Sequence, residues 1–211
     1  MDAHRSRPTT DRARLVLATV AAAALLVVPV LAGAACAPAP LDGCRHSTVP
    51  GKSRLILRSG VRPDKQTLVW KLFRGEATQT AYYGSPTTTD EYDFCIYGAD
   101  DTVVYEAAIP PGGQCGARKC WNAIGDRGFR YRDGQGRNDG ITKVRLYRGD
   151  EGRTRVIVKG RGVNLPPADM PFGLPTLVQL QAANGHCWEA SFSSGGVTRN
   201  SETRFGGRSD P

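Results

Sequence analysis

The fold is decided by residues 106–113 (EAAIPPGG), which recur as residues 189–196 (EASFSSGG). Upstream of this pair, two other segments repeat in the same order, each second copy lying roughly 85 residues after the first. These matches are LILRSG at 55–60 with VRLYRG at 144–149, and Thr67-Leu68-Val69 up to Arg74-Gly75 with Thr154-Arg155-Val156 up to Arg161-Gly162. Such a repeat predicts two copies of one supersecondary unit, each covering an apolar face of the other.

Short β-rich runs bounded by turn residues dominate the chain after residue 35, and no window longer than ten residues has a convincing helical period. Residues 92–97 alternate in polarity, and a turn at 98–101 leads into 102–107, which is typical of a hairpin. Further strands are expected at 54–58, 67–73, 129–132, 141–147, 154–159, 176–181 and 187–192. The sequence therefore predicts an all-β protein in which two tandem β repeats pack as a sandwich or a partly closed barrel.

The first 35 residues have the pattern of a secretory signal, with four arginines followed by an almost wholly apolar run that ends in small residues. An uncleaved membrane anchor and a lipid attached to Cys36 are the alternatives. Loss of residues 1–35, which hold four Arg and two Asp, lowers the net charge from +8 to +6 and leaves 176 residues. We therefore predict an exported protein, periplasmic or extracellular, that touches a membrane only in the two alternative cases.

Four segments follow from these patterns. They are a signal peptide at 1–35, β repeat 1 at 36–113, β repeat 2 with an inserted Gly-rich loop at 114–196, and a polar tail of lower order at 197–211. The inserted loop occupies 121–140, and Gly, Asn and Asp residues are dense in it.

An even number of cysteines in an exported chain predicts a disulfide framework. The six residues are Cys36, Cys44, Cys95, Cys115, Cys120 and Cys187. Their places in the repeat favour the pairs Cys36–Cys44, Cys115–Cys120 and Cys95–Cys187. The alternative set, Cys44–Cys95, Cys120–Cys187 and Cys36–Cys115, stays open. No C-x-x-C motif is present and the histidines are poorly placed for zinc, so we expect no metal and no cofactor.

The sequence contains only weak motifs for a catalytic or calcium site. After residue 35 the only histidines are His46 and His186, and neither accompanies a nucleophile motif. Asp133, Asn138 and Asp139 are weak candidates for an irregular calcium loop, because they depart from the EF-hand spacing. We name no catalytic residue, and a secreted hydrolase of envelope polymers using Asp133, Asp139 and His186 is the alternative function.

The strongest functional pattern is cationic. Lys143 and Arg145 alternate with apolar residues, and Arg153, Arg155 and Lys159 share one parity on the following strand. In a hairpin these five cations would lie on one face, which can attract an acidic polysaccharide or another envelope polyanion. The simpler interpretation is a solvated face that protects the sheet from aggregation.

No motif for specific nucleic-acid recognition is present. Trp121 and Trp188, each directly after a cysteine, are expected to pack in the core rather than to bind sugars. We therefore expect a non-enzymatic structural or binding role in the cell envelope or outside the cell.

Short motifs form a series along the chain: KCW at 119–121, GFRYRD at 128–133, KGRGVNLP at 159–166 and CWEA at 187–190. This series resembles a family of uncharacterised exported bacterial proteins. The resemblance covers most of the chain after residue 35 and implies export. No activity is assigned to that family, so it implies no catalytic residue.

Overall fold

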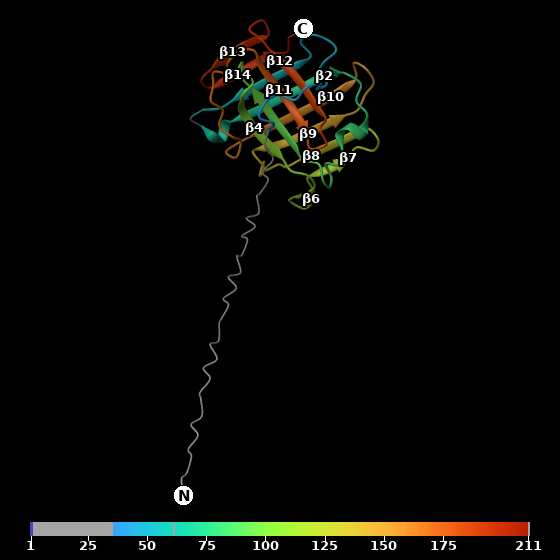
Figure 1. The fold of residues 1–211 in the computed structure, drawn as a ribbon. Helices are drawn as coiled ribbons and strands as arrows, with labels where there is room; N and C mark the ends of the chain where they lie inside the picture. The colour runs from blue at the N-terminus through green and yellow to red at the C-terminus, as the bar shows by residue number, and fades with distance from the viewer. Residues whose placement is uncertain (2–35, 61, 211) are drawn as a thin grey trace. The chain divides into compact units, whose positions relative to one another are not determined.

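Two antiparallel β-sheets, packed face to face, form the body of the protein (Figure 1). The computed structural model describes Met1, residues 36–60 and residues 62–210. Apart from Met1, the predicted signal peptide lies outside these residues. The all-β prediction is confirmed, because the described elements are strands and two short 3-10 helices. Within the described ranges, no helix is long and apolar enough to cross a membrane.

The large sheet has eight strands in the spatial order β13-β14-β1-β2-β10-β9-β8-β7. Its strands are β1 (Ser53–Arg58), β2 (Thr67–Gly75), β7 (Trp121–Ala123), β8 (Gly128–Arg132), β9 (Ile141–Tyr147), β10 (Thr154–Arg161), β13 (Val197–Ser201) and β14 (Arg204–Arg208). Residues 36–113 and 114–196 both supply strands to this sheet, so the two predicted repeats do not correspond to one main sheet each.

The small sheet has four strands in the order β12-β11-β3-β4. They are β3 (Tyr92–Tyr97), β4 (Val103–Ile109), β11 (Thr176–Ala182) and β12 (Cys187–Phe192). A separate two-stranded sheet contains β5 (Gln114–Cys115) and β6 (Arg118–Lys119), and the 3-10 helices are η1 (Pro63–Lys65) and η2 (Thr80–Tyr83).

The core lies between the sheets because alternate residues of each strand turn inward. In β1, for example, Leu55 and Leu57 are fully buried, whereas the arginines beside them are exposed. Trp121 and Trp188 are buried, as predicted. The Trp188 ring stacks on the Tyr83 ring with centroids 4.8 Å apart, so the small sheet and η2 share one aromatic contact.

The disulfides are Cys36–Cys95, Cys44–Cys187 and Cys115–Cys120. Of the favoured pairs only Cys115–Cys120 is confirmed. Cys36–Cys44 and Cys95–Cys187 are wrong, and so is every pair of the alternative set. Because Cys36 is bonded to Cys95, its sulfur is not available to carry a lipid.

Strand order explains why Cys95 and Cys187 do not bond. Strand β11 lies between them, since Gln179 pairs with Cys95 while Gln181 pairs with Cys187. Two strand spacings separate backbones by roughly 9–10 Å, beyond the roughly 7 Å limit for a disulfide. Cys44 reaches Cys187 instead because Arg45 extends the small sheet beside β12, donating its N–H to the Cys187 carbonyl at 2.9 Å.

The predicted polar tail is ordered, so that prediction is wrong. Strand β14 pairs with β1 over five positions, from Arg54 opposite Arg208 to Arg58 opposite Arg204. Phe205, fully buried, anchors β14 in the core. The Asp210 carboxylate then accepts hydrogen bonds from the Ser193 backbone and hydroxyl, which fastens the end of the chain beyond β12.

The inserted segment 121–140 adds β7 and β8 to the large sheet. Its loop closes against the KGRGVNLP motif: Arg161 donates its N–H to the Gly140 carbonyl, and Asn164 donates to the Gly136 carbonyl. Gly140 has φ +67°, and a Cβ there would lie 2.6 Å from the Leu165 Cα. The inserted loop and the KGRGVNLP motif thus meet at one corner, where their contacts hold the fold together.

Candidate functional site: the cationic face

Basic side chains cover the outer side of the large sheet, which we call the cationic face. Along β9, Val144 and Leu146 are fully buried, so Lys143 and Arg145 turn away from the core. The neighbouring strands follow the same alternation. The burial of apolar residues therefore determines where the charges lie.

The five predicted binding residues occupy two parts of this face. Lys143 pairs directly with Lys159 across β9 and β10. Arg145 lies opposite Ile157, not opposite another cation. Arg153 precedes β10 and, together with Arg74 and Arg155, lines a hollow of about 390 Å³. The predicted cations of the two strands share one face, and Arg153 extends it into the turn.

Strand pairing extends this face well beyond the five predicted residues, because paired residues on neighbouring strands have side chains on the same side. One row crosses the sheet as Arg130, Arg145, Ile157, Lys71, Arg54 and Arg208. The next row runs Arg132, Lys143, Lys159, Val69, Ile56, Gly206 and Arg199. The cations of β1, β2, β8, β13 and β14 were not predicted to join this face, because non-local pairing brings them together.

Carboxylates are missing from these strands. The eight strands, all within the described part of the chain, contain fourteen Lys and Arg residues and no Asp or Glu. No ion pair in the described residues involves a cation of these strands. The positive charge of the face is therefore not neutralised from within the described structure.

Burial and then neighbouring charge perturb the ammonium group of Lys143. Partial burial lowers the pKa of this ammonium group, and repulsion from neighbouring cations, Lys159 first, lowers it further. A nearby anion would remove that repulsion, so the face is electrostatically suited to a negatively charged ligand.

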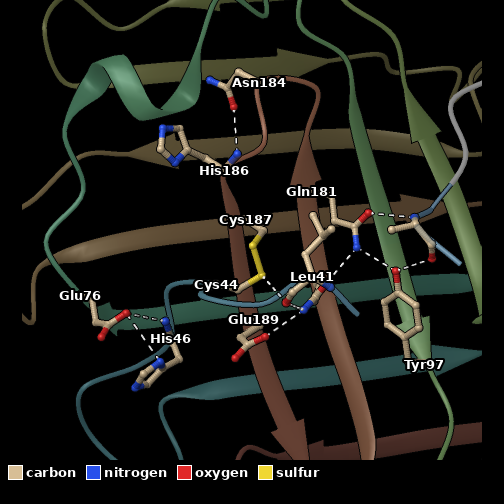
Figure 2. Close-up of a disulfide and its surroundings, with 12 residues drawn as sticks. Leu41, Cys44, His46, Glu76, Tyr97, Gln181, Asn184, His186, Cys187 and Glu189 are labelled. Atoms are coloured by element: carbon tan, nitrogen blue, oxygen red, sulfur yellow. Dashed lines mark hydrogen bonds and ion pairs between the residues drawn. A yellow bond between two sulfur atoms is a disulfide. The ribbon is translucent and has the colours of Figure 1, made fainter. Parts of the chain in front are cut away.

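The outer side of the small sheet differs, because residues 36–45 lie across it as a strap (Figure 2). The buried Gln179 side chain accepts a hydrogen bond from the Leu41 N–H at 3.0 Å and donates to the Leu41 carbonyl at 2.8 Å. Gln181 accepts from the Ala37 N–H and donates to the Tyr97 hydroxyl. Uncharged amides thus satisfy the backbone of the strap.

The strands of the small sheet carry only negative charge: Asp93, Glu106 and Glu189, with no Lys or Arg. Burial raises the pKa of Asp93 to about 7, and repulsion from Glu91, then from Glu106 and Asp139, adds to the rise. Burial also raises the pKa of Glu189. Opposite charges are therefore segregated between the two sheets.

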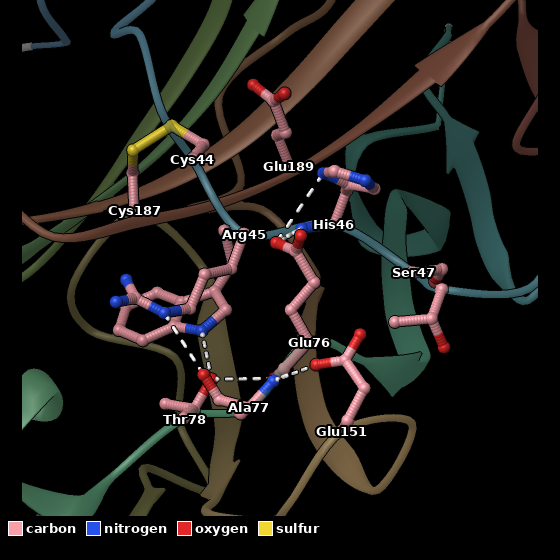
Figure 3. A network of polar contacts seen from close by, with 12 residues as sticks. Cys44, Arg45, His46, Ser47, Glu76, Ala77, Thr78, Glu151, Cys187 and Glu189 are labelled. Atoms are coloured by element: carbon pink, nitrogen blue, oxygen red, sulfur yellow. Dashed lines mark hydrogen bonds and ion pairs between the residues drawn. A yellow bond between two sulfur atoms is a disulfide. The ribbon is translucent and has the colours of Figure 1, made fainter.

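A polar network joins the strap to the large sheet (Figure 3). His46 donates its N–H to the Glu76 carboxylate at 3.1 Å, and Glu151 accepts from the Ala77 N–H at 2.9 Å. The Arg45 guanidinium lies over the Tyr82 ring, 4.2 Å from its centroid. These contacts fix the strap, and the His46 ring lies 3.6 Å from the Glu76 carboxylate.

The calcium candidates have other contacts. Asp133 is 1% exposed and accepts hydrogen bonds from the N–H groups of Gln135 and Arg137. Asn138 donates to the Tyr131 hydroxyl, and Asp139 accepts from the Ala108 N–H at 2.7 Å. In the residues that the structure describes, no group of three His, Cys, Asp or Glu is arranged to hold a metal ion.

The hydrolase candidates Asp133, Asp139 and His186 share no hydrogen bond with one another. The His186 ring packs on Tyr82, with centroids 4.7 Å apart. At Asp133, burial raises the carboxyl pKa, but the hydrogen bonds from the loop outweigh it and the pKa is lowered. Each of the three residues is held by a separate structural contact.

Comparison with protein-family models, with curated proteins and with solved structures finds no match. The resemblance to uncharacterised exported proteins therefore stays a prediction, and the function is argued from the cationic face.

Proposed function

We propose that this protein is an exported, non-enzymatic β-protein that binds an anionic polymer of the cell envelope or its surroundings through the cationic face. The observation that carries this proposal is the charge of the large sheet, with fourteen cations and no carboxylate in its strands. An extended sheet face with rows of cations suits a chain of regularly spaced anions better than it suits a small molecule. An acidic polysaccharide is the favoured partner.

Retention on immobilised dextran sulfate tests the proposal. The wild-type protein should elute at a salt concentration well above that of a neutral protein, and its affinity should fall steeply as salt rises. Arg145→Glu together with Arg155→Glu should weaken binding at least about tenfold, because two cations of the face become repulsive. Retention that does not depend on salt would contradict the proposal.

The matched control is Arg118→Glu with Lys119→Glu, which changes the net charge equally. These residues are exposed in β6, outside the large sheet. The control should elute close to the wild type. If both double variants weaken binding equally, net charge alone governs retention and the assignment to the cationic face is wrong.

We also propose that residues 1–35 are a cleaved signal peptide. Three disulfides support an oxidising compartment. Cleavage after Ala34 or Ala35 would leave Cys36 near the start of the mature chain, bonded to β3. N-terminal sequencing of the secreted protein should begin at Ala35 or Cys36, and an intact N-terminus in the membrane fraction would contradict cleavage.

We further propose that residues 36–113 and 114–196 are copies of one unit. The strand orders support this. In the large sheet the order is β1-β2-β10-β9, so the matching strands β2 and β10 are neighbours and β1 and β9 flank them. In the small sheet the order is β4-β3-β11-β12, with the matching strands β3 and β11 as neighbours and β4 and β12 flanking them. Burial agrees at two matches, with Leu55 and Val144 both buried and Ala107 and Ala190 both buried.

The middle match of the repeat needs a shift by one residue. Leu68 is fully buried, but its partner in the sequence match, Arg155, is exposed. A match of Trp70 with Val158 restores the agreement, because both side chains are fully buried. In an experimental structure, strands of the two copies should superpose by a rotation near 180°, and any other relation would contradict the repeat.

The second candidate function is hydrolysis of an envelope polymer. The observation in its favour is a hollow of about 450 Å³ lined by His46, Glu189 and Asp210. Burial raises the pKa of Glu189, whereas hydrogen bonds from Ser193 and Ser191 outweigh burial and lower the pKa of Asp210. Release of soluble fragments from cell-wall polymer, abolished by Glu189→Gln, would support this function over binding alone.

A further inference from the structure

A second hollow lies over β13, β14 and β1 at one end of the cationic face, far from the predicted residues in the sequence. It has a volume of about 300 Å³ and is lined by four arginines, Arg54, Arg199, Arg204 and Arg208, over Ile56 and Gly206. We call it the arginine hollow. Nothing in the sequence analysis singled out these residues.

Strand register explains the hollow. Gly206 occupies the position in β14 that faces outward between Arg204 and Arg208 on the same strand. Gly206 pairs with Ile56 of β1 on one side and with Arg199 of β13 on the other. A Cβ at Gly206 would meet no atom within 4 Å, so the absence of a side chain there leaves open space among the arginines.

The guanidinium groups around this space have no anionic partner in the described structure. No salt bridge among the described residues involves any of the four arginines. The Arg204 Nε is buried and donates to no acceptor. A buried donor without a partner is unfavourable, so Arg204 gains if its side chain turns this donor toward an acceptor in the hollow.

We propose that the arginine hollow is a subsite for a tetrahedral oxyanion group, either a sulfate monoester with one negative charge or a phosphate monoester with up to two. Guanidinium groups bind such tetrahedral anions through paired N–H donors, and several arginines can surround one group. The inference rests on the proposed function in taking this group to be part of the polymer on the cationic face. The hollow would hold one charged group and so fix the position of the chain.

A polymer is favoured over a lipid surface by the lack of apolar anchors. Beyond Met1, the large apolar side chains exposed in the described residues are Val49 and Val163, and neither belongs to a strand of the large sheet. The next hollow also contains cations: Arg204 lines a space of about 300 Å³ together with Arg58, Arg62 and Lys65. Two adjacent cationic hollows suit successive charged groups of one chain.

The test is a titration of isotope-labelled protein with sodium sulfate at constant ionic strength, followed by NMR. The Arg204 Nε–H and the Gly206 and Gly207 amides should shift and reach saturation. Inorganic phosphate should bind severalfold more tightly at pH 8 than at pH 5, because its second pKa of about 6–7 lies between these values. Sulfate should show no such change.

Two variants isolate the hollow. Gly206→Val fills it without altering the charge, and its Cβ meets no atom within 4 Å. Arg204→Lys keeps the charge but removes the Nε–H donor. Each should weaken sulfate binding at least about tenfold. Gly134→Val, also at an open position but in the loop after β8, should bind sulfate like the wild type.

The outcomes separate the two proposals. The arginine hollow is overturned if the shifts do not saturate, or if Gly206→Val and Arg204→Lys bind sulfate as tightly as the wild type. This holds even if dextran sulfate retention depends on the cationic face. Saturable sulfate binding without polymer retention keeps the hollow but overturns the proposed function. Equal or stronger binding to anionic phosphatidylglycerol vesicles than to dextran sulfate would overturn the polymer as the source of the anion.

Discussion

The outer sides of the two sheets are built by the same strand alternation, yet they differ in charge and in cover. The large sheet presents cations to solvent, whereas the small sheet carries carboxylates and lies beneath the strap of residues 36–45. Where the strap covers the sheet, neutral amides such as Gln179 and Gln181 form the buried hydrogen bonds. Burial penalises charge unless it is paired, so a covered face favours amides while an open face can keep its arginines.

The same difference has a consequence for binding. Charge that is segregated by sheet orients the molecule in the field of a polyanion, with the large sheet toward the polymer and the small sheet away from it. The strap is then a structural device on the side that does not bind. Three experiments test this difference between the sheets.

The largest effect should come from releasing the strap at Cys44, while the Cys36–Cys95 disulfide still holds its other end. Cys44→Ala with Cys187→Ala removes a link between residues 143 positions apart, and loss of such a link should lower the free energy of unfolding by about 3–5 kcal/mol. Chemical denaturation would measure the loss, with the m-value fitted for each protein because the unfolded chain is less compact without the disulfide.

The internal control is Cys115→Ala with Cys120→Ala, which opens a link between residues only 5 positions apart. The loop is short, and the pair lies by the separate β5–β6 sheet, so we expect a loss of about 2 kcal/mol or less. Dextran sulfate retention should survive both changes. If release of the strap abolishes retention in protein that is still folded, the small sheet contributes to binding and the comparison fails.

Much of the fold could be predicted from local patterns. The strands at 92–97, 141–147 and 187–192 coincide with β3, β9 and β12, because apolar alternation and turn residues mark them. The C-terminal strands were missed because β14 contains two glycines and a single buried aromatic residue, Phe205, between arginines. Only pairing with β1, far away in the sequence, makes this segment a strand.

The candidate site was predictable only in part, for the same reason. Lys143 and Lys159 lie on strands joined by a short turn, so parity was enough to place them on one face. Arg54 and Arg208 meet through the pairing of β1 with β14, for which no local pattern exists. Two of the three predicted disulfide pairs were wrong for the same reason, because a strap crossing the small sheet cannot be inferred from cysteine spacing.

An intermediate effect should come from the carboxylates of the small sheet. Asp93 has a pKa of about 7 in the folded protein, against 3.8 as its ordinary value. The folded state therefore loses stability as pH rises from about 4 to 7, because the unfolded chain ionises first. Asp93→Asn should stabilise the protein by about 1–2 kcal/mol at pH 8, after allowance for solvent screening, and by almost nothing at pH 4.

Denaturant titrations of both proteins between pH 4 and pH 8 would measure this difference. Glu106→Gln, which removes a neighbouring charge and leaves Asp93 in place, should give a smaller gain over the same range. A gain from Asp93→Asn that is constant with pH would mean that Asp93 titrates normally, and the repulsion assigned to the small sheet would then be wrong.

The smallest effect should come from placing a carboxylate on the cationic face. This change should raise the stability of the fold and lower the affinity for a polyanion. Ile157 is half-buried on β10, paired with Arg145 on one side and Lys71 on the other. Ile157→Glu should form cross-strand ion pairs worth about 0.5–1 kcal/mol relative to Ile157→Gln, which has nearly the same shape and cost of lost apolar packing. The same carboxylate should weaken dextran sulfate retention by about three- to tenfold relative to the glutamine variant.

A face that merely solvates the protein would gain the stability, yet its retention would not depend on this position. If the glutamate variant is more stable and binds less tightly, the unpaired cations are maintained at a cost to the fold, and ligand binding is the reason that explains that cost.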